Sequence, residues 1–193
     1  MAVNLSKGQK VSLTKDRASL SKISVGLGWD TKRFDGGSDF DLDSVIFLVT
    51  GNGSVKDQDD FIFYGNLTHK TGSVQHMGDN KTGIGDGDDE VINITLKDIP
   101  PYVERIIIAA TIYEAEQRNQ NFGQVENAYI KIYDQLKNET ILQYDLNEDF
   151  SIETSMVFGE IYRNNDEWKF NAIGSGFFGG LAALCATYGL DAN

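Results

Sequence analysis

The sequence predicts an all-β fold, a two-sheet antiparallel β-sandwich of about ten short strands with a short helix near its carboxyl end. Short runs of β-branched and aromatic residues recur along the chain, and turn residues close each run. An apolar share of 40% is typical of a protein that buries a core. No low-complexity tract, linker or internal repeat marks a boundary. We therefore expect residues 1–193 to form a single domain.

The strands are expected in ten runs of the sequence. In chain order these are residues 11–14, 23–29, 44–50, 61–67, 91–96, 105–113, 128–134, 141–146, 156–163 and 168–173. The run at 91–96 alternates apolar and polar side chains, as in a strand with one face toward solvent. The segments 45–49 and 105–112 are apolar on both faces, so we expect them at the centre of a sheet, covered on both sides.

The remaining elements follow from turn residues and periodicity. Residues 164–166, Asn-Asn-Asp, are expected to form a hairpin turn. Apolar side chains between residues 181 and 188 recur at the i, i+3, i+4, i+7 spacing of a short helix, which Gly189 can cap. Residues 174–179 have the Gly-x-Gly-x-x-Gly spacing of a dinucleotide site, but too little chain follows to supply a second strand. We expect a flexible turn there.

Composition excludes several classes of function. The formal net charge of −12 makes the chain a poor ligand for nucleic acid or an anionic membrane, and cations are its natural partners. No apolar run has the length of a signal peptide core or a membrane span, so we expect a soluble, cytoplasmic protein. The single cysteine, Cys185, lies in an apolar segment and is expected to be an inert core thiol.

Histidine chemistry has little support in the sequence. His69 and His76 lie in a turn-rich stretch, without the spacing of a zinc site, and are expected to be solvated loop residues. No Gly-x-Ser-x-Gly nucleophile motif is present, and nothing else indicates acyl transfer.

The acidic clusters carry the functional information. The first, residues 79–90, contains Asp79, Asn80, Asp86, Asp88, Asp89 and Glu90 on a loop that three glycines allow to curl. Crowded carboxylates either raise each other's pKa or bind a counter-charge. Calcium takes oxygen ligands in irregular geometry, which such a loop offers. The loop is not an EF-hand, because Lys81 and Ile84 occupy positions that require an oxygen donor and a glycine.

A second cluster contains Asp30, Asp35, Asp39, Asp41 and Asp43. If the chain is extended as it enters the strand near residue 44, Asp39, Asp41 and Asp43 point to one side while Phe40 and Leu42 point to the other. A solvated loop or a charged strand edge that prevents aggregation would explain one cluster alone. Two clusters beside apolar strands favour shared metal ligation at one end of the sandwich.

Six segments occur in order along nearly the whole chain. They are GLGWD at 26–30, FDLDSVIFLV at 40–49, DFIFYGNL at 60–67, HMGDNKTGIGDGDDE at 76–90, RNQNFGQVENAYI at 118–130 and DEWKF at 166–170. Together these segments resemble the TerD family of tellurium-resistance and general stress proteins. The resemblance implies a calcium-binding β-sandwich of the bacterial cytoplasm, associated with resistance to tellurite, other chemical stress, phage and colicins. The family is not known as a simple enzyme, so no catalytic residues are expected.

The resemblance also implies partners and a ligand set. The expected partners are calcium ions, other Ter-type proteins and a TerC-type integral-membrane protein, through which the chain would reach the inner membrane without inserting into it. The metal residues carried over are Asp30, Asp41, Asp43, Asp79, Asn80, Asp86, Asp88, Asp89 and Glu90. The chain departs from the family at Ile84, where relatives often carry an acid, and at Tyr113-Glu114, where they carry His-Asp. Glu114 is therefore a second-tier candidate.

Three functions remain open at the level of sequence. The leading hypothesis is a non-enzymatic protein in which calcium orders the acidic loops and gates partner docking. The same carboxylates would also suit a magnesium-dependent hydrolase or phosphoryl-transfer enzyme, with Lys81 as the nearby cation. A calcium-dependent carbohydrate binder would need Trp29 or Trp168 as an exposed stacking platform, and we expect Trp29 in the core.

Overall fold

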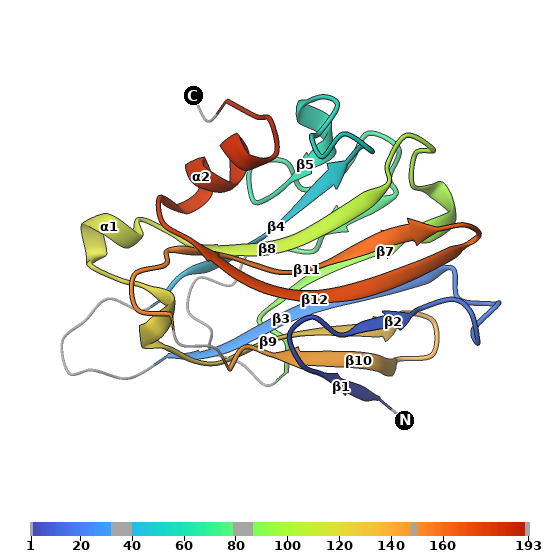
Figure 1. The fold of residues 1–193 in the computed structure, drawn as a ribbon, viewed down its shortest axis with the longest axis horizontal. Coiled ribbons are helices and arrows are strands. Elements are labelled where there is room, and N and C mark those ends of the chain that lie inside the picture. The colour runs from blue at the N-terminus through green and yellow to red at the C-terminus, as the bar shows by residue number, and fades with distance from the viewer. Residues whose placement is uncertain (1, 32–39, 79–86, 148–149, 192–193) are drawn as a thin grey trace.

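The computed structural model describes residues 2–31, 40–78, 87–147 and 150–191, and in this part of the chain the strands form two six-stranded sheets (Figure 1). Sheet A contains, in spatial order, β1 (Val3–Leu5), β10 (Glu139–Asp145), β9 (Val125–Asp134), β3 (Lys22–Thr31), β7 (Glu90–Thr95) and β6 (Val74–His76). Sheet B contains β2 (Lys10–Ser12), β12 (Glu167–Phe177), β11 (Ser155–Asn164), β8 (Arg105–Ile112), β4 (Leu42–Val49) and β5 (Phe61–Ile62).

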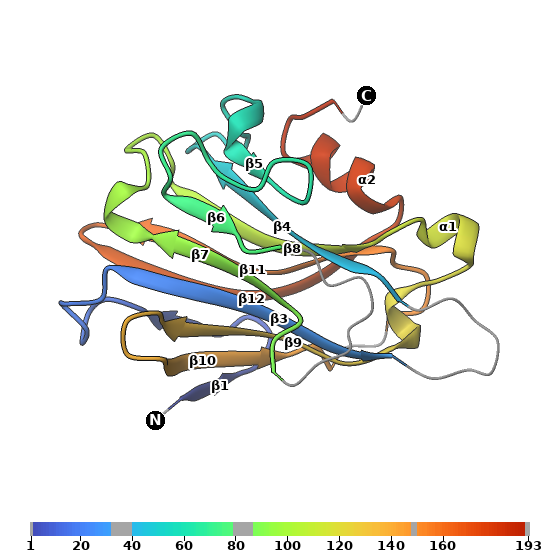
Figure 2. The same cartoon turned by 180° about the vertical axis from the view of Figure 1, so that it is seen from behind.

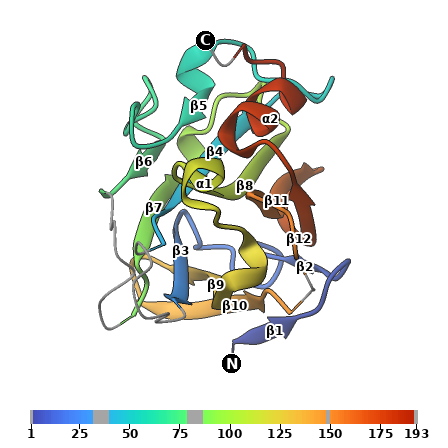
Figure 3. The same cartoon turned by 90° about the vertical axis from the view of Figure 1, so that its left-hand side faces the viewer.

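The predicted all-β sandwich is confirmed. The sheets pack face to face, and their inward side chains form one core that draws on both, including Ile23, Val25 and Ile130 from sheet A and Ile46 and Ile108 from sheet B. Every strand pair is antiparallel except β1 with β10, which is parallel. Strands β4 and β8 are covered on both faces, as their composition predicts, because the helix α2 (Gly180–Thr187) packs on the outer face of sheet B (Figure 3).

The local predictions are confirmed at several points. β7 alternates buried and half-buried residues, so one face is wetter than the other. The hairpin turn joins β11 to β12, with Asn165 in a left-handed conformation at φ 56°. α2 ends at Thr187, where Gly189 has φ 81° and donates its N–H to the Ala186 carbonyl, which closes the helix as a glycine cap does.

Other elements differ from prediction. Residues 174–177 continue β12, so the expected flexible turn there was wrong. β1 and β6 were not predicted, and β6 lies at the edge of sheet A beside β7 (Figure 2). The expected strand at 61–67 is regular only over Phe61–Ile62. Short helical turns were also not predicted, namely α1 (Ala115–Arg118), η1 (Gln58–Asp60), η2 (Leu96–Asp98) and η3 (Phe122–Gln124). No helix in the described ranges is both long and apolar enough to cross a membrane.

Strand direction brings the acidic positions to one end of the sandwich. β3 runs antiparallel to both β7 and β9, so its carboxyl end lies beside the first residues of those strands (Figure 3). β4 begins at the same end, because the Ser44 N–H donates to Glu90 Oε2, at the start of β7, over 2.6 Å. We call this region the acidic end.

Candidate metal centre

Asp30 and Asp89 lie together where β3 ends. Asp30 accepts a hydrogen bond from Asn127 Nδ2 at 2.7 Å. Asp89 accepts the Trp29 N–H at 3.0 Å and donates its own N–H to the Leu27 carbonyl at 2.8 Å. Burial raises the pKa of the Asp89 carboxyl, against the lowering effect of the Trp29 N–H, and the neighbouring carboxylates raise it further. The repulsion expected from the sequence is therefore present in the fold.

Both carboxylates line a hollow of about 380 Å³ on the outer side of sheet A, which we call the sheet-A hollow. Its polar lining side chains are those of Asp30, Asp89, Asn127, Tyr129, Gln143, Asp145 and Asn147, and the described part of the chain contributes no lysine, arginine or histidine to the lining. Calcium prefers carboxylate and amide oxygens, so the chemistry of this donor set fits that ion. Sequence reasoning missed Asp145 and Asn147, although the pairing of β10 with β9 would have placed them at the acidic end.

Asp88 has a different environment. Its Oδ1 lies 2.8 Å from Lys131 Nζ and accepts a hydrogen bond from the Tyr129 hydroxyl at 3.0 Å. The carboxylate lies over Gly26, where any side chain would collide with it. Burial raises the pKa of the Tyr129 phenol, and the Asp88 charge raises it further. The counter-charge of Asp88 is thus a lysine ammonium, and the residue fixes the chain to the outer face of sheet A.

Glu90 lies between the sheets, with 2% of its surface exposed. Besides the Ser44 N–H, its Oε2 faces His76 Nε2 at 3.5 Å, and Ser44 Oγ lies 3.0 Å from the same nitrogen. The Gly78 N–H donates to His76 Nδ1 at 3.2 Å. Glu90 Oε1 is buried and has no hydrogen-bond partner among the described residues. The expectation that His76 is a solvated loop residue was wrong, since it is 3% exposed.

Asp41 and Asp43 lie at the start of β4 in sheet B, across the core from the sheet-A hollow. Leu42 points between the sheets, so the two aspartates point away from them, as the alternation at residues 40–43 predicts. Asp43 lines a second hollow of about 310 Å³ together with Glu114 and the start of α2. Glu114 has an unusual φ of 50° for a residue with a side chain, and its carboxylate pairs with Arg118 at 3.2 Å.

The structure therefore separates the predicted ligands instead of gathering them at one point. Within the described ranges, no group of three or more His, Cys, Asp or Glu side chains is close enough to hold a metal ion. Asp79, Asn80 and Asp86 lie outside the described residues, as do Asp35, Asp39, Lys81 and Ile84. Of the predicted ligands, Asp30 and Asp89 share the sheet-A hollow, Asp88 pairs with Lys131, and Glu90 is interior.

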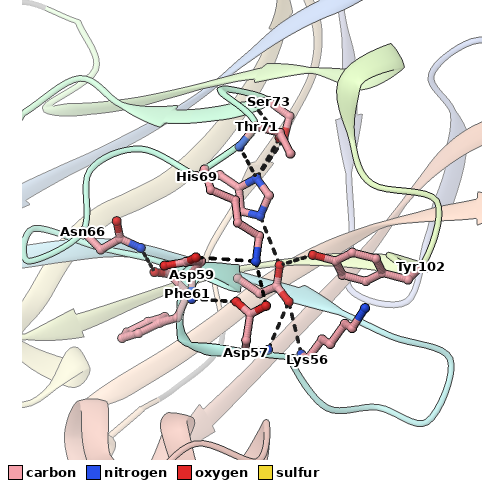
Figure 4. A network of polar contacts seen from close by, with 11 residues as sticks. Lys56, Asp57, Asp59, Phe61, Asn66, His69, Thr71, Ser73 and Tyr102 are labelled. Atoms are coloured by element: carbon pink, nitrogen blue, oxygen red, sulfur yellow. Dashed lines mark hydrogen bonds and ion pairs between the residues drawn. The ribbon is translucent and has the colours of Figure 1, made fainter.

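A second buried histidine, His69, lies beside the first residue of β6, whereas His76 ends that strand, and it belongs to a network that the sequence did not reveal (Figure 4). His69 Nε2 is 3.1 Å from Asp60 Oδ1, and both side chains are fully buried. Tyr102 donates its hydroxyl to the same oxygen at 2.8 Å, and the N–H groups of Lys56 and Asp57 donate to Asp60 Oδ2. Thr71 Oγ1 lies 2.8 Å from His69 Nδ1. The prediction that His69 is solvated was also wrong.

The remaining candidates are core residues. Trp29 and Trp168 are 3% and 7% exposed, and Arg163 covers the Trp168 ring at 4.2 Å. Neither tryptophan offers the exposed platform that carbohydrate stacking needs. Cys185 is buried, and burial raises the pKa of its thiol, so it is the inert core thiol that the sequence predicted.

Comparison with known proteins identifies the family of the chain, which the geometry of the site does not. The model of the TerD domain matches residues 1–188. The chain belongs to the TerD family. General stress protein 16U of Bacillus subtilis (strain 168) is 54% identical over 191 residues, 99% of each chain. Tellurium resistance protein TerD of Serratia marcescens is 52% identical over 193 residues, the whole of both chains.

A solved structure supports the fold. The crystal structure of a homologue of telluride resistance protein (TerD) from Streptomyces coelicolor A3(2) superposes with a TM-score of 0.70 at 20% identity, over 86% of this chain and 95% of that one. The names of the relatives refer to tellurium resistance and to stress, and not to a catalysed reaction. This TerD-family chain is therefore placed in a tellurium-resistance and stress-response family.

Proposed function

We propose that this TerD-family chain is a non-enzymatic calcium-binding protein of the stress response, associated with tellurite resistance. The observation that carries the proposal is the sheet-A hollow, whose described lining holds Asp30, Asp89 and Asp145 and no cationic side chain. A hollow with that lining attracts a cation, and the oxygen donors suit calcium. Asp79, Asn80 and Asp86 stay predictions as further ligands, as do Asp41, Asp43 and Glu90.

Two physical features support a link between metal and loop order. The carboxyl group of Asp89 has a raised pKa because it is partly desolvated beside other acids, and a bound divalent cation would reverse that effect. Glu90 begins β7 with one buried carboxylate oxygen that has no partner among the described residues. A positive charge at the acidic end would stabilise both groups, so calcium would stabilise the folded state.

The consequence we propose is a switch in surface charge. Without calcium the acidic end carries a strong negative potential, and with calcium that potential falls. Partner docking that the repulsion prevents would then become favourable. The expected partners are other Ter-type proteins and a TerC-type integral-membrane protein, so the chain would act in the cytoplasm and reach the inner membrane only through a partner.

The test is calorimetric titration of chelator-treated protein with calcium and, separately, with magnesium. We expect saturable calcium binding that Asp89→Asn weakens. Asp166→Asn is the matched control, because Asp166 is exposed in the hairpin turn at the opposite end of the sandwich. Absence of calcium binding, or an equal loss in both variants, would overturn the proposal.

The same experiment separates the alternatives. Preference for magnesium, together with turnover of a phosphoester, would favour a metal-dependent hydrolase. That alternative needs a cationic clamp near the metal. Lys81, the cation that the sequence suggested, lies outside the described residues, and Lys131, a described cation beside Asp88, is already paired with it. The carbohydrate-binding alternative loses its support because both tryptophans are buried.

A further inference from the structure

An apolar pocket lies on the far side of sheet B from the sandwich core, between η1, β5 and the helix α2. Its volume is about 480 Å³, within the roughly 300–1,000 Å³ typical of small-molecule sites. The apolar wall is formed by Phe61 and Phe63 on one side and by Leu181, Ala182, Cys185 and Leu190 on the other. None of these residues is a candidate metal ligand, although Leu181 also lines the hollow that contains Asp43.

The phenylalanine rings limit the shape of the ligand. Phe61 is stacked between Phe47 and Phe63, with ring centroids 4.7 and 4.4 Å apart. The Phe63 ring also meets Gly65, whose missing side chain leaves room for it, and forms a T-shaped contact with Tyr64. Both faces of the Phe61 ring are thus covered, and one face of the Phe63 ring lies against Phe61, so the pocket offers mainly ring edges and aliphatic groups. An aliphatic body fits that wall better than a flat aromatic ring or a cation held on a ring face.

The rim defines the charge of the ligand. Asp59 and Asp191 are exposed carboxylates at the pocket, and no lysine, arginine or histidine is found among its described lining residues. Asp191 forms no ion pair with any residue that the structure describes, and Asp59 is 3.5 Å from Lys70, a separation typical of a weak surface pair. An apolar cavity with acidic residues at its mouth is complementary to a molecule with an apolar body and a positive head.

We propose that this pocket binds a small organic ammonium compound with an aliphatic body, which inserts between β5 and α2 while its ammonium group faces Asp59 and Asp191. The site is separate from calcium binding, and neither proposal depends on the other. The pocket lies on one side of α2, so a bound ligand would also stabilise the packing of that helix on sheet B.

The probe is octylammonium, compared with octanol and octanoate below their aggregation concentrations, with binding followed by NMR shifts of the α2 amides. We expect saturable binding of octylammonium, about fivefold weaker binding of octanol and still weaker binding of octanoate. Equal binding of octanol and octylammonium would overturn the assignment of a cationic head. Absence of saturation by octylammonium would overturn the site.

Two matched pairs of variants locate the ligand. Ala182→Leu fills the pocket, whereas Ala186→Leu makes the same change one turn later on α2, at an exposed alanine outside the lining. Only the first should weaken octylammonium binding, by tenfold or more.

Removing both rim charges, with Asp59→Asn and Asp191→Asn, should weaken octylammonium binding about fivefold. Asp16→Asn with Asp166→Asn, an equal charge change at exposed sites, controls for the protein's net charge, and an equal effect of the two pairs would overturn the proposal.

Discussion

The protein buries two carboxylates that each face a buried histidine, and the two differ in how completely the fold satisfies them. Asp60 has partners at both oxygens, from Tyr102, His69 and two backbone N–H groups. Glu90 has partners at Oε2 only, while Oε1 has none among the described residues. A buried carboxylate is costly unless its oxygens are paired. Asp60 therefore belongs to a structural network, whereas Glu90 is suited to a ligand that arrives later.

The largest effect expected from this comparison is on the Asp60 network. Asp60→Ala would remove the shared acceptor of Tyr102 and two backbone N–H groups and leave His69 buried without its partner. We expect a loss of about 3–5 kcal/mol in the free energy of unfolding, measured by denaturant titration. Asp59→Ala is the control, since the neighbouring side chain is 58% exposed, and it should change stability by less than about 0.5 kcal/mol. Similar losses in both variants would show that Asp60 has no special role.

Glu90→Gln tests the other half of the comparison. The substitution keeps the size of the side chain and its acceptor for Ser44, so metal-free stability should fall much less than in Asp60→Ala. A ligand at 100 times its dissociation constant stabilises a protein by about 2.7 kcal/mol. Because Glu90 lies between the sheets and does not line the sheet-A hollow, we expect Glu90→Gln to remove part of that gain for calcium. Thermal unfolding with and without calcium measures it. Glu104→Gln, at the exposed residue just before β8 and at the end of the sandwich opposite the acidic end, should retain the full gain, and retention by Glu90→Gln would contradict the proposed role.

Tyr102→Phe sharpens the comparison by removing one partner of Asp60. Burial, the hydrogen bond to Asp60 and its charge raise the pKa of the Tyr102 phenol to about 12. The folded state therefore favours the neutral phenol, so this stabilisation is present below about pH 10 and is lost as pH rises through the folded value. At neutral pH the variant should lose about 1–2 kcal/mol of unfolding free energy.

The alkaline range gives the specific signature of that hydrogen bond. The unfolding free energy measured between pH 9 and 12 should decline less steeply in Tyr102→Phe than in the parent. In an absorbance titration, the variant should show one fewer phenol ionising at high pH. Tyr113→Phe, at an exposed tyrosine, is the control for loss of a phenol as such. Parallel pH curves for the parent and Tyr102→Phe would contradict the assignment.

The sequence predicts secondary-structure elements better than it predicts contacts between side chains. Alternation and apolar runs identified β7, β4 and β8, because solvent exposure on each face acts directly on composition. β1 was missed because its three residues gain strand geometry only from parallel pairing with distant β10. The glycines of residues 174–176 indicated a turn, yet Gly176 lies in β12 where the Glu153 and Phe150 side chains approach closely.

The candidate site was predicted only as a region for the same reason. The charge pattern located Asp30 and Asp89, which do share a hollow. It could not reveal that Asp88 pairs with Lys131, 43 positions away, or that His76 and Glu90 approach each other from adjacent strands. Such pairings depend on strand register, and periodicity carries no information about register between distant strands.

Substitution of Lys131 gives the smallest predicted effect. It tests directly how much of the negative charge at the acidic end the protein itself neutralises. The Lys131 ammonium neutralises the Asp88 carboxylate. The exposed fraction is 24% for the lysine side chain and 8% for the aspartate side chain. Lys131→Met keeps the length of the side chain and removes the charge, so the acidic end becomes more negative. We expect calcium affinity to rise about fivefold, the equivalent of about 1 kcal/mol.

Lys137→Met separates this local effect from a change in net charge. Lys137 also pairs with an aspartate, Asp134 at 3.8 Å, but lies in the turn between β9 and β10 at the opposite end of the sandwich. Calorimetric titration should show little change in calcium affinity for that variant, because screening attenuates charges over that separation. A fall in affinity for Lys131→Met would mean that the pair acts mainly by holding Asp88 and the start of β7 in place. The lysine would then be a structural support of the metal centre, as Tyr102 is of Asp60, and not a competitor of the ion.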